Sequence, residues 1–152
     1  MKLSIIVPVY NMAADGKLEY CLDSLVNQTI SDYEIIAVDD CSTDNSWDIL
    51  QSYAEKYPDK FHNIHSEVNK KQGGAKNIGM GLARGEWIGF IDSDDWITPD
   101  FYERLIRKGE ETGADMVGCD YHLTGEHSMK IGQVVPNNKP EQTGVLTREK
   151  YR

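Results

Sequence analysis

Short apolar runs alternate with segments of helical spacing along most of this chain, and this alternation limits the fold more than any other feature. The apolar runs predict buried strands over residues 3–9, 34–38, 61–65, 86–91 and 115–121. The helical spacing of apolar residues predicts helices over residues 17–28, 47–57, 72–83 and 99–112. Strands separated by helices of this length form βαβ units, so we expect an α/β fold with a mostly parallel sheet flanked by helices.

The chain beyond residue 121 departs from this pattern. It holds one strand-like run at 129–135, a polar loop with two prolines and the beginning of a helix. We therefore expect a core domain over residues 1–121 and a second, incomplete region over 122–152, in a chain truncated from a longer protein. Within the core, Thr98 is expected to cap the last helix, with Pro99 in its first position.

The composition is that of an ordinary globular chain with an excess of acidic residues. The 152 residues suit one domain, and the formal net charge of -9 argues against nucleic acid as a partner, because phosphate backbones attract basic surfaces. Three widely spaced cysteines favour a reduced, cytoplasmic environment. The N-terminus lacks a signal-peptide pattern, and no run of about 20 apolar residues occurs.

Polar residues follow three of the expected strands. Tyr10 and Asn11 come after the first strand, Asp39 and Asp40 close the second, and the acidic segment 92–95 follows the fourth. Ligands of an open parallel sheet bind beyond the carboxyl ends of its strands, so we expect these groups to share one edge. Strand ends are often polar, and chance placement is the alternative.

Asp92 and Asp94 are two residues apart, so both side chains face the same way if extended geometry persists. Two carboxylates ~5 Å apart at a partly buried rim repel by roughly 3 kcal/mol at an effective dielectric near 20. A divalent cation removes that cost, and oxygen ligands suit Mg²⁺ or Mn²⁺. The alternative is an acidic loop in solvent, with Asp95 near the start of the next helix.

Three motifs in order carry a family resemblance. The stretch "SIIVPVYN", then "VDDCSTDNS", then "GGAKNIGMGLARGEWIGFIDSDDW" resembles the nucleotide-sugar-dependent glycosyltransferases of family 2, which have the GT-A fold. The resemblance runs from about Leu3 to Tyr121. It implies an enzyme that moves a sugar from a nucleotide-diphosphate donor, with UDP-sugar favoured, to an acceptor hydroxyl with inversion. Residues 122–152 would then begin the acceptor-side region.

The resemblance implies a role in nucleoside binding for the first two motifs. Pro8, Tyr10 and Asn11 match a loop that lies against the base, and Tyr10 could stack on it. Asp39 and Asp40 match an acidic pair in which one carboxylate accepts the base N–H, and Asp40 is preferred. The alternatives are a rim aromatic for Tyr10 and capping of the following helix for the acidic pair.

The third motif implies binding of the diphosphate and the metal. Asp94 is expected to coordinate Mn²⁺ or Mg²⁺, and Asp92 to contact the metal or the ribose, with Ser93 in the nucleotide-sugar-binding set. Lys76 stands where the family usually has arginine, which removes a bidentate contact to phosphate. Gly73 would allow close approach to the donor. The alternative is close helix–sheet packing through Gly73, Gly79 and Gly81.

The general base is the part of the family pattern that this chain lacks. A Glu-Asp motif that supplies it is absent after Tyr121, so we expect the base beyond Arg152. The resemblance also implies a glycan or lipid-linked glycan acceptor, surface polysaccharide synthesis and peripheral association with the inner face of the membrane. The alternatives are a nucleotide-sugar-binding fragment without catalysis and a nucleotidyltransferase. The nucleotidyltransferase is disfavoured, because no glycine-rich loop follows the first strand.

Overall fold

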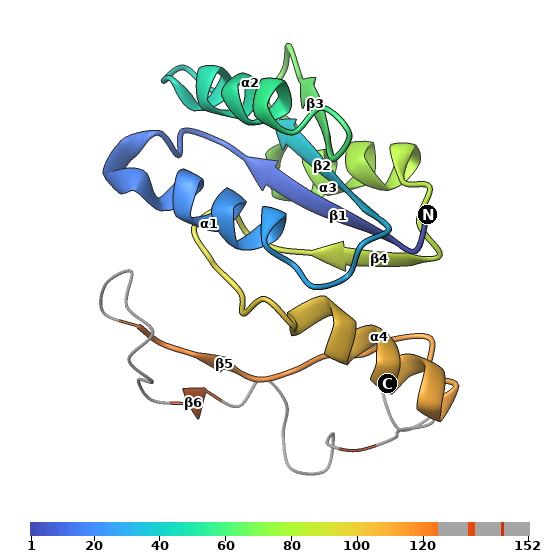
Figure 1. Ribbon diagram of the computed structural model, residues 1–152. Coiled ribbons are helices and arrows are strands. Elements are labelled where there is room, and N and C mark those ends of the chain that lie inside the picture. Colours follow the sequence, from blue (N-terminus) through green and yellow to red (C-terminus); the bar gives the residue numbers. More distant parts are fainter. Residues whose placement is uncertain (125–133, 136–143, 145–152) are drawn as a thin grey trace. The chain divides into compact units, whose positions relative to one another are not determined.

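The computed structural model describes residues 1–124, 134–135 and 144, in two units that comprise residues 1–103 and 104–152. The first unit holds a four-stranded, all-parallel sheet in the order β3-β2-β1-β4 (Figure 1). Its strands are β1 (Leu3–Val9), β2 (Tyr33–Asp39), β3 (Phe61–His65) and β4 (Trp87–Phe90). The predicted mostly parallel α/β sheet is therefore confirmed, and four strands lie where they were expected.

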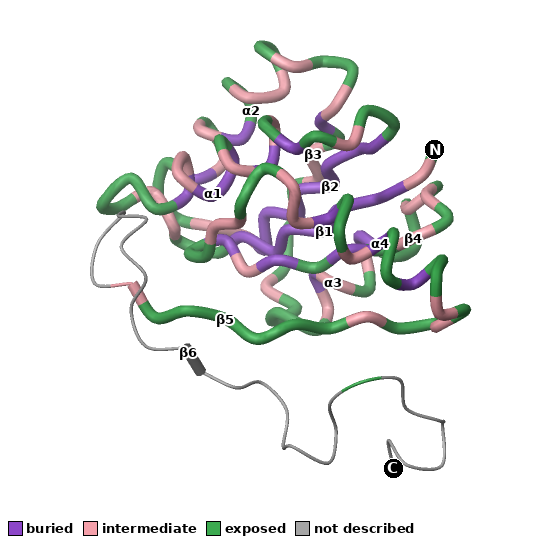
Figure 2. Tube along the Cα trace, turned by 60° about the horizontal axis from the view of Figure 1, so that its bottom comes forward, coloured by how far each residue is buried: buried purple, intermediate pink, exposed green. Residues whose placement is uncertain are grey.

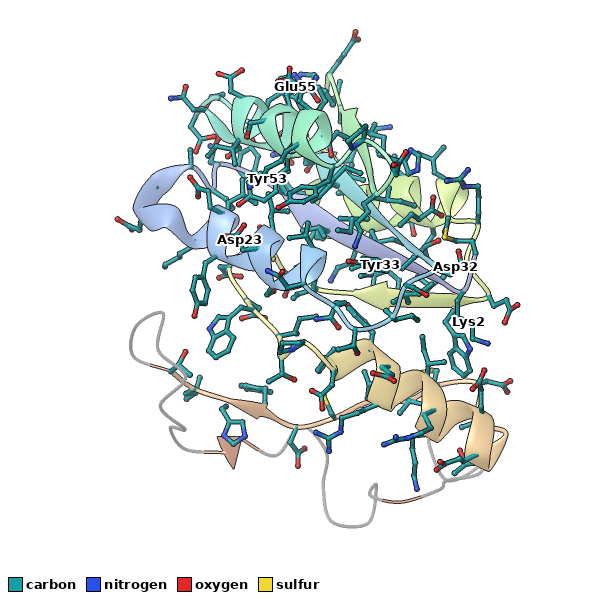
Figure 3. All side chains as sticks on the ribbon, in the orientation of Figure 1. Lys2, Asp23, Asp32, Tyr33, Tyr53 and Glu55 are labelled. Atoms are coloured by element: carbon teal, nitrogen blue, oxygen red, sulfur yellow. The ribbon has the colours of Figure 1, made fainter. Side chains whose placement is uncertain are left out.

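Helices cover both faces of this sheet. The helical elements are the short η1 (Ala14–Gly16), α1 (Lys17–Val26), α2 (Ser46–Lys56), α3 (Lys71–Leu82) and α4 (Phe101–Thr112). Helix α3 lies on one face, and α1 and α2 lie on the other (Figure 1). Tyr53 of α2 points toward Asp23 of α1 and donates a 2.7 Å hydrogen bond to its carboxylate (Figure 3). Burial, followed by this bond, raises the pKa of Tyr53, so the phenol stays a donor.

The core lies around the two central strands. Every residue of β1 and β2 is buried, as the continuous purple of these strands in Figure 2 shows. Helix α3 approaches β1 closely at Gly79, where an added Cβ would lie 2.5 Å from Ile6 Cγ2. Continuous burial on both faces is typical of a parallel strand covered by helices, which explains the unbroken apolar runs in the sequence.

Two predictions about the chain after β4 are wrong. Helix α4 begins at Phe101, so Pro99 lies in the preceding loop, where its carbonyl accepts a bond from Thr29. The expected strand at 115–121 is replaced by β5 (Tyr121–His122), which pairs antiparallel with β6 (Val134–Val135). Met116 in the expected strand is 71% exposed, so that segment has no buried face. Of the run at 129–135, only its last two residues lie within the described part.

A buried carboxylate joins the amino ends of β1 and β2. Glu34 accepts hydrogen bonds from Ser4 Oγ at 2.7 Å and from Arg84 Nε at 3.0 Å. Burial opposes ionisation of Glu34, but the bonds from Arg84 and Ser4 outweigh it and hold the pKa of Glu34 below its usual value. The ion pair of Glu34 and Arg84 lies at the amino edge of the sheet, opposite the carboxyl edge where the polar loops gather.

The low pKa of Glu34 predicts a loss of stability in acid. Because the folded pKa is depressed, its contribution is full above the unfolded value of 4.5 and is lost as pH falls through the folded pKa. We expect Glu34→Gln to lower the free energy of unfolding at about pH 7 and to show a shallower loss below about pH 4.5 than wild type. Urea unfolding across this range, with exposed Glu67→Gln as control, measures it. Parallel pH curves for Glu34→Gln and wild type would contradict it.

Among the described residues, no helix combines the length and the apolar composition that crossing a membrane requires.

Candidate functional site

A cleft of about 400 Å³ opens at the carboxyl edge of the sheet. Four segments that are distant in sequence form it: the end of β1 with its following loop, the residue after β2, the start of α3, and the loop after β4. The lining residues are Pro8, Val9, Tyr10, Met12, Asp40, Asn69, Lys71, Gln72, Ala75, Asp92, Ser93 and Asp94. The carboxyl edge of the sheet, where the polar residues were predicted to gather, therefore contains a cleft lined by three carboxylates.

The two carboxylates after β2 have different surroundings. Asp40 is buried, lines the cleft and accepts a 2.7 Å hydrogen bond from the backbone N–H of Lys70. Asp39 does not line the cleft. Its Oδ2 lies 2.7 Å from His65 Nδ1, and its buried Oδ1 has no hydrogen-bond partner among the described residues. Of this pair, Asp40 is therefore the one exposed to the cleft.

The loop after β4 brings Asp92, Ser93 and Asp94 to the cleft wall together. Asp92 Oδ1 accepts a 2.7 Å bond from Gln72 Nε2 and lies 3.2 Å from Lys76 Nζ. Asp94 is exposed. The loop thus presents one carboxylate that protein groups hold in place and a second that faces solvent.

The predicted residues at the end of β1 and directly after it also divide into those that line the cleft and those that do not. Pro8 and the half-exposed Tyr10 line the cleft. Asn11 is outside the lining set and adopts a positive φ of 51°. Its side chain accepts a 2.8 Å bond from the backbone N–H of Thr43, so Asn11 joins two loops instead of facing the cleft.

The glycines of α3 show where close packing occurs. Among the residues that the structure describes, an added Cβ at Gly73 or Gly81 would meet nothing within 4 Å, whereas one at Gly79 would strike Ile6 of β1. The helix–sheet packing considered for all three therefore holds for Gly79 alone. Gly73 does not line the cleft, and Lys76 reaches it only through its ion pair with Asp92.

The loop after β4 is a region of negative potential. Partial burial, followed by the charges of Asp94 and Asp92, raises the pKa of Asp95. Burial and the charge of these three carboxylates also raise the pKa of the Cys21 thiol. A cation placed beside Asp94 would relieve this repulsion, which is the electrostatic condition for a metal site.

The residues present fit a divalent cation that shares its ligands with a substrate. Within residues 1–124, 134–135 and 144, no group of three or more His, Cys, Asp or Glu side chains is arranged to hold a metal ion. Mg²⁺ commonly binds through one or two carboxylates and completes its shell with water and substrate phosphates, so no such group is needed. Asp94 and Asp92 supply oxygen ligands of the required kind at one wall of the cleft.

Several lining residues carried no signal in the sequence. Gln72 fixes Asp92, and Asn69 lies beside it in the cleft wall. Lys71 lines the cleft from the first residue of α3 with a φ of 64°, a strained backbone for a lysine. A polar run before a helix usually indicates only a solvated loop. That Asn69, Lys71 and Gln72 contribute to the cleft wall could therefore be seen only in the folded structure.

The region of this chain that is similar to known proteins includes the whole site. The sequence model described as "Glycosyl transferase family 2" matches residues 4–148, which include every residue that lines the cleft. EpsH from Bacillus subtilis (strain 168), whose name describes it as a glycosyltransferase, is 48% identical over 129 residues, which cover 84% of this chain and 36% of EpsH.

Two solved structures share the fold. S. aureus TarS in complex with UDP-GlcNAc matches with a TM-score of 0.65 and 32% identity, over 74% of this chain and 32% of that chain. The mannosyltransferase PcManGT from Pyrobaculum calidifontis, in complex with GDP-Man and Mn²⁺, matches with a TM-score of 0.65 and 26% identity, over 70% and 31%. These matches confirm the predicted GT-A fold class. This chain spans about a third of the length of EpsH, of the TarS fragment 1–349 and of the PcManGT chain.

Proposed function

Because this chain belongs to glycosyltransferase family 2, we propose that its cleft binds a nucleotide-diphosphate sugar, with a UDP-sugar favoured. The protein to which the chain corresponds would transfer the sugar to an acceptor hydroxyl with inversion. One observation carries the proposal: Asp40, Asp92 and Asp94, from two different strand ends, line a single cleft. The UDP-GlcNAc bound by TarS and the GDP-Man bound by PcManGT support a donor of this class.

The nucleoside occupies the part of the cleft between β1 and β2. Asp40 accepts the N3–H of uracil, since one of its oxygens is held by Lys70 and the other is available in the cleft wall. Tyr10 stacks on the base, and Pro8 forms an apolar floor beneath it. Asp39 acts indirectly, because its carboxylate binds His65 and lies outside the cleft.

The diphosphate occupies the part beside the loop after β4. Asp94, with Asp92 beside it, holds a divalent cation such as Mn²⁺, and Gln72 and Lys76 fix the orientation of Asp92. When bound, the cation stabilises the negative charge that develops on the departing diphosphate. Ser93 lies buried between the two carboxylates and lines the same wall, where its hydroxyl binds the donor. The Mn²⁺ in PcManGT supports this assignment.

Transfer with inversion needs a general base on the acceptor hydroxyl, within hydrogen-bond reach of the attacking oxygen. We place that base outside residues 1–152, together with most of the acceptor site. The acceptor is a glycan or a lipid-linked glycan of a surface polysaccharide, made on the cytoplasmic side of the membrane. Incubation with Mn²⁺ and UDP-sugars, followed by assay of released UDP, separates a catalyst from a binding fragment. Calorimetry with UDP tests donor binding alone.

Replacing Asp40 by asparagine tests the proposed hydrogen bond between Asp40 and the uracil ring. Asparagine keeps one oxygen for the backbone N–H of Lys70 but presents an amide N–H where uracil also has a donor. We expect UDP affinity to fall about tenfold or more, since a hydrogen bond to a charged acceptor is worth about 1.5–3 kcal/mol. Cytosine carries an acceptor at N3, so affinity for CDP should fall less. Calorimetry with both nucleotides measures the ratio.

The control for this variant is Asp48→Asn, an exposed carboxylate on α2. It should leave both affinities unchanged. Equal losses of UDP and CDP affinity in Asp40→Asn would contradict a contact between this carboxylate and the base.

A further inference from the structure

The loop after β1 is held by side chains from the loop after β2 and from the first residue of α2. Three consecutive backbone N–H groups of this loop are donors. That of Asn11 bonds Ser42 Oγ at 2.9 Å. That of Met12 bonds Ser46 Oγ at 2.7 Å, and that of Ala13 bonds Asp44 Oδ2 at 2.9 Å. We call Ser42, Asp44 and Ser46 the clasp.

The clasp residues, serine and aspartate, are of the types that usually cap a helix. The residue at the N-cap of α2, Asn45, makes no side-chain cap bond. The clasp reaches across 31 to 34 positions of sequence to the loop after β1, and Asp44 alone also bonds the first N–H of α2. Its oxygens therefore satisfy backbone donors at the cleft rim, where loops would otherwise depend on water.

Asp44 is the central member of the clasp, because its carboxylate joins the loop after β1 to the start of α2. Oδ2 accepts from Ala13, while Oδ1 accepts a 2.9 Å bond from the backbone N–H of Ser46. Partial desolvation opposes ionisation, but the bonds from Ser46 and Ala13 hold the pKa of Asp44 below its usual value. The bridge therefore consists of charge-assisted hydrogen bonds, whereas the hydroxyls of Ser42 and Ser46 are neutral acceptors.

The segment that the clasp fixes carries two residues of the cleft wall, Tyr10 and Met12. Both belong to the part of the cleft that we assign to the nucleoside, and none of the clasp residues lines the cleft. We propose that Asp44 is a positioning residue, which preorganises Tyr10 and Met12 so that the cleft accepts a nucleobase. This inference rests on the proposed function, because it presumes that a nucleoside diphosphate is bound.

The test compares UDP with inorganic pyrophosphate, both with Mn²⁺, in wild type and Asp44→Ala. A loop that adopts the competent arrangement only about a tenth of the time weakens apparent affinity about tenfold, so we expect that loss for UDP. Affinity for pyrophosphate should stay unchanged. Asp44→Asn, which retains one acceptor oxygen, should recover part of the UDP affinity. Ser52→Ala on α2, whose hydroxyl bonds only Ile49 in its own helix, is the control.

Hydrogen exchange provides a readout without ligand. The backbone amides of Met12 and Ala13 should lose protection in Asp44→Ala, and Ser46→Ala repeats the test with a smaller change if the first variant does not fold. Equal losses of UDP and pyrophosphate affinity, or unchanged UDP affinity, would overturn the positioning role. A wild-type chain that binds pyrophosphate but not UDP would instead overturn the proposed function, and the exchange result would still report on the clasp.

Discussion

Replacement of Asp94 by asparagine is expected to remove the dependence of UDP binding on Mn²⁺ and to leave the fold intact. Asp94 is exposed and lines the cleft, whereas Asp92 is already bound by Gln72 and Lys76. Asparagine keeps the shape but loses the charge that a hard cation requires. Wild type should bind UDP at least about tenfold more tightly with Mn²⁺ than without it, a difference of about 1.4 kcal/mol, and Asp94→Asn should bind equally in both.

The neighbouring Asp95 provides the matched control. It lies one residue further along the same loop and outside the cleft lining. Asp95→Asn should keep the Mn²⁺ dependence, although it also removes one negative charge from this loop. Thermal unfolding of both variants should match that of wild type or exceed it, because each relieves repulsion among carboxylates. Mn²⁺ dependence that survives in Asp94→Asn would show that another group holds the cation.

Gly85→Ala should produce the largest loss of stability among the substitutions considered. A Cβ at this position would lie 2.4 Å from Ser4 N, 2.6 Å from Leu3 C and 2.8 Å from Trp87 O. All three are backbone atoms of paired strands, so none can rotate away. We expect a loss of about 3 kcal/mol or more in the free energy of unfolding, at the upper end of what overpacking costs. Urea unfolding measures it.

Gly81→Ala is the control, since a Cβ there meets nothing within 4 Å. Alanine is a better helix former than glycine, so Gly81→Ala within α3 should be neutral or more stable by about 0.5–1 kcal/mol. Comparable stability of Gly85→Ala and wild type would mean that the turn between α3 and β4 can shift away from β1. The close contact with β1 would then not be a fixed feature of the fold.

The parallel sheet was predictable because its strands are covered on both faces. Burial of both faces makes strands such as β1 and β2 continuous apolar runs, and helical spacing marks the connections. The same reasoning failed at residues 115–121. The apolar residues there do not form a buried face, and the pairing of β5 with β6 depends on partners 12 and 14 positions away. The close contacts of Gly85 likewise gave no signal in the sequence, since they come from backbone atoms of β1 and β4.

The candidate site was predictable in its location but not in its internal assignments. Adjacent carboxylates at the end of a strand must diverge, but the sequence does not say which one faces the cleft. The structure turns Asp39 toward His65 and Asp40 toward the cleft. Long-range contacts such as those of Gln72 and Asp44 were also invisible, because each joins segments far apart in sequence. Strand ends are set by local pattern, whereas side-chain partners are set by the packing of the whole unit.

A crystal of this chain grown with UDP and Mn²⁺ would test the central claim most directly. We expect an anomalous manganese peak bonded to a carboxylate oxygen of Asp94 and to both phosphates of UDP, with the uracil N3–H against Asp40. UDP bound in the cleft with manganese absent from the Asp92–Asp94 wall, or bound elsewhere on the chain, would contradict it.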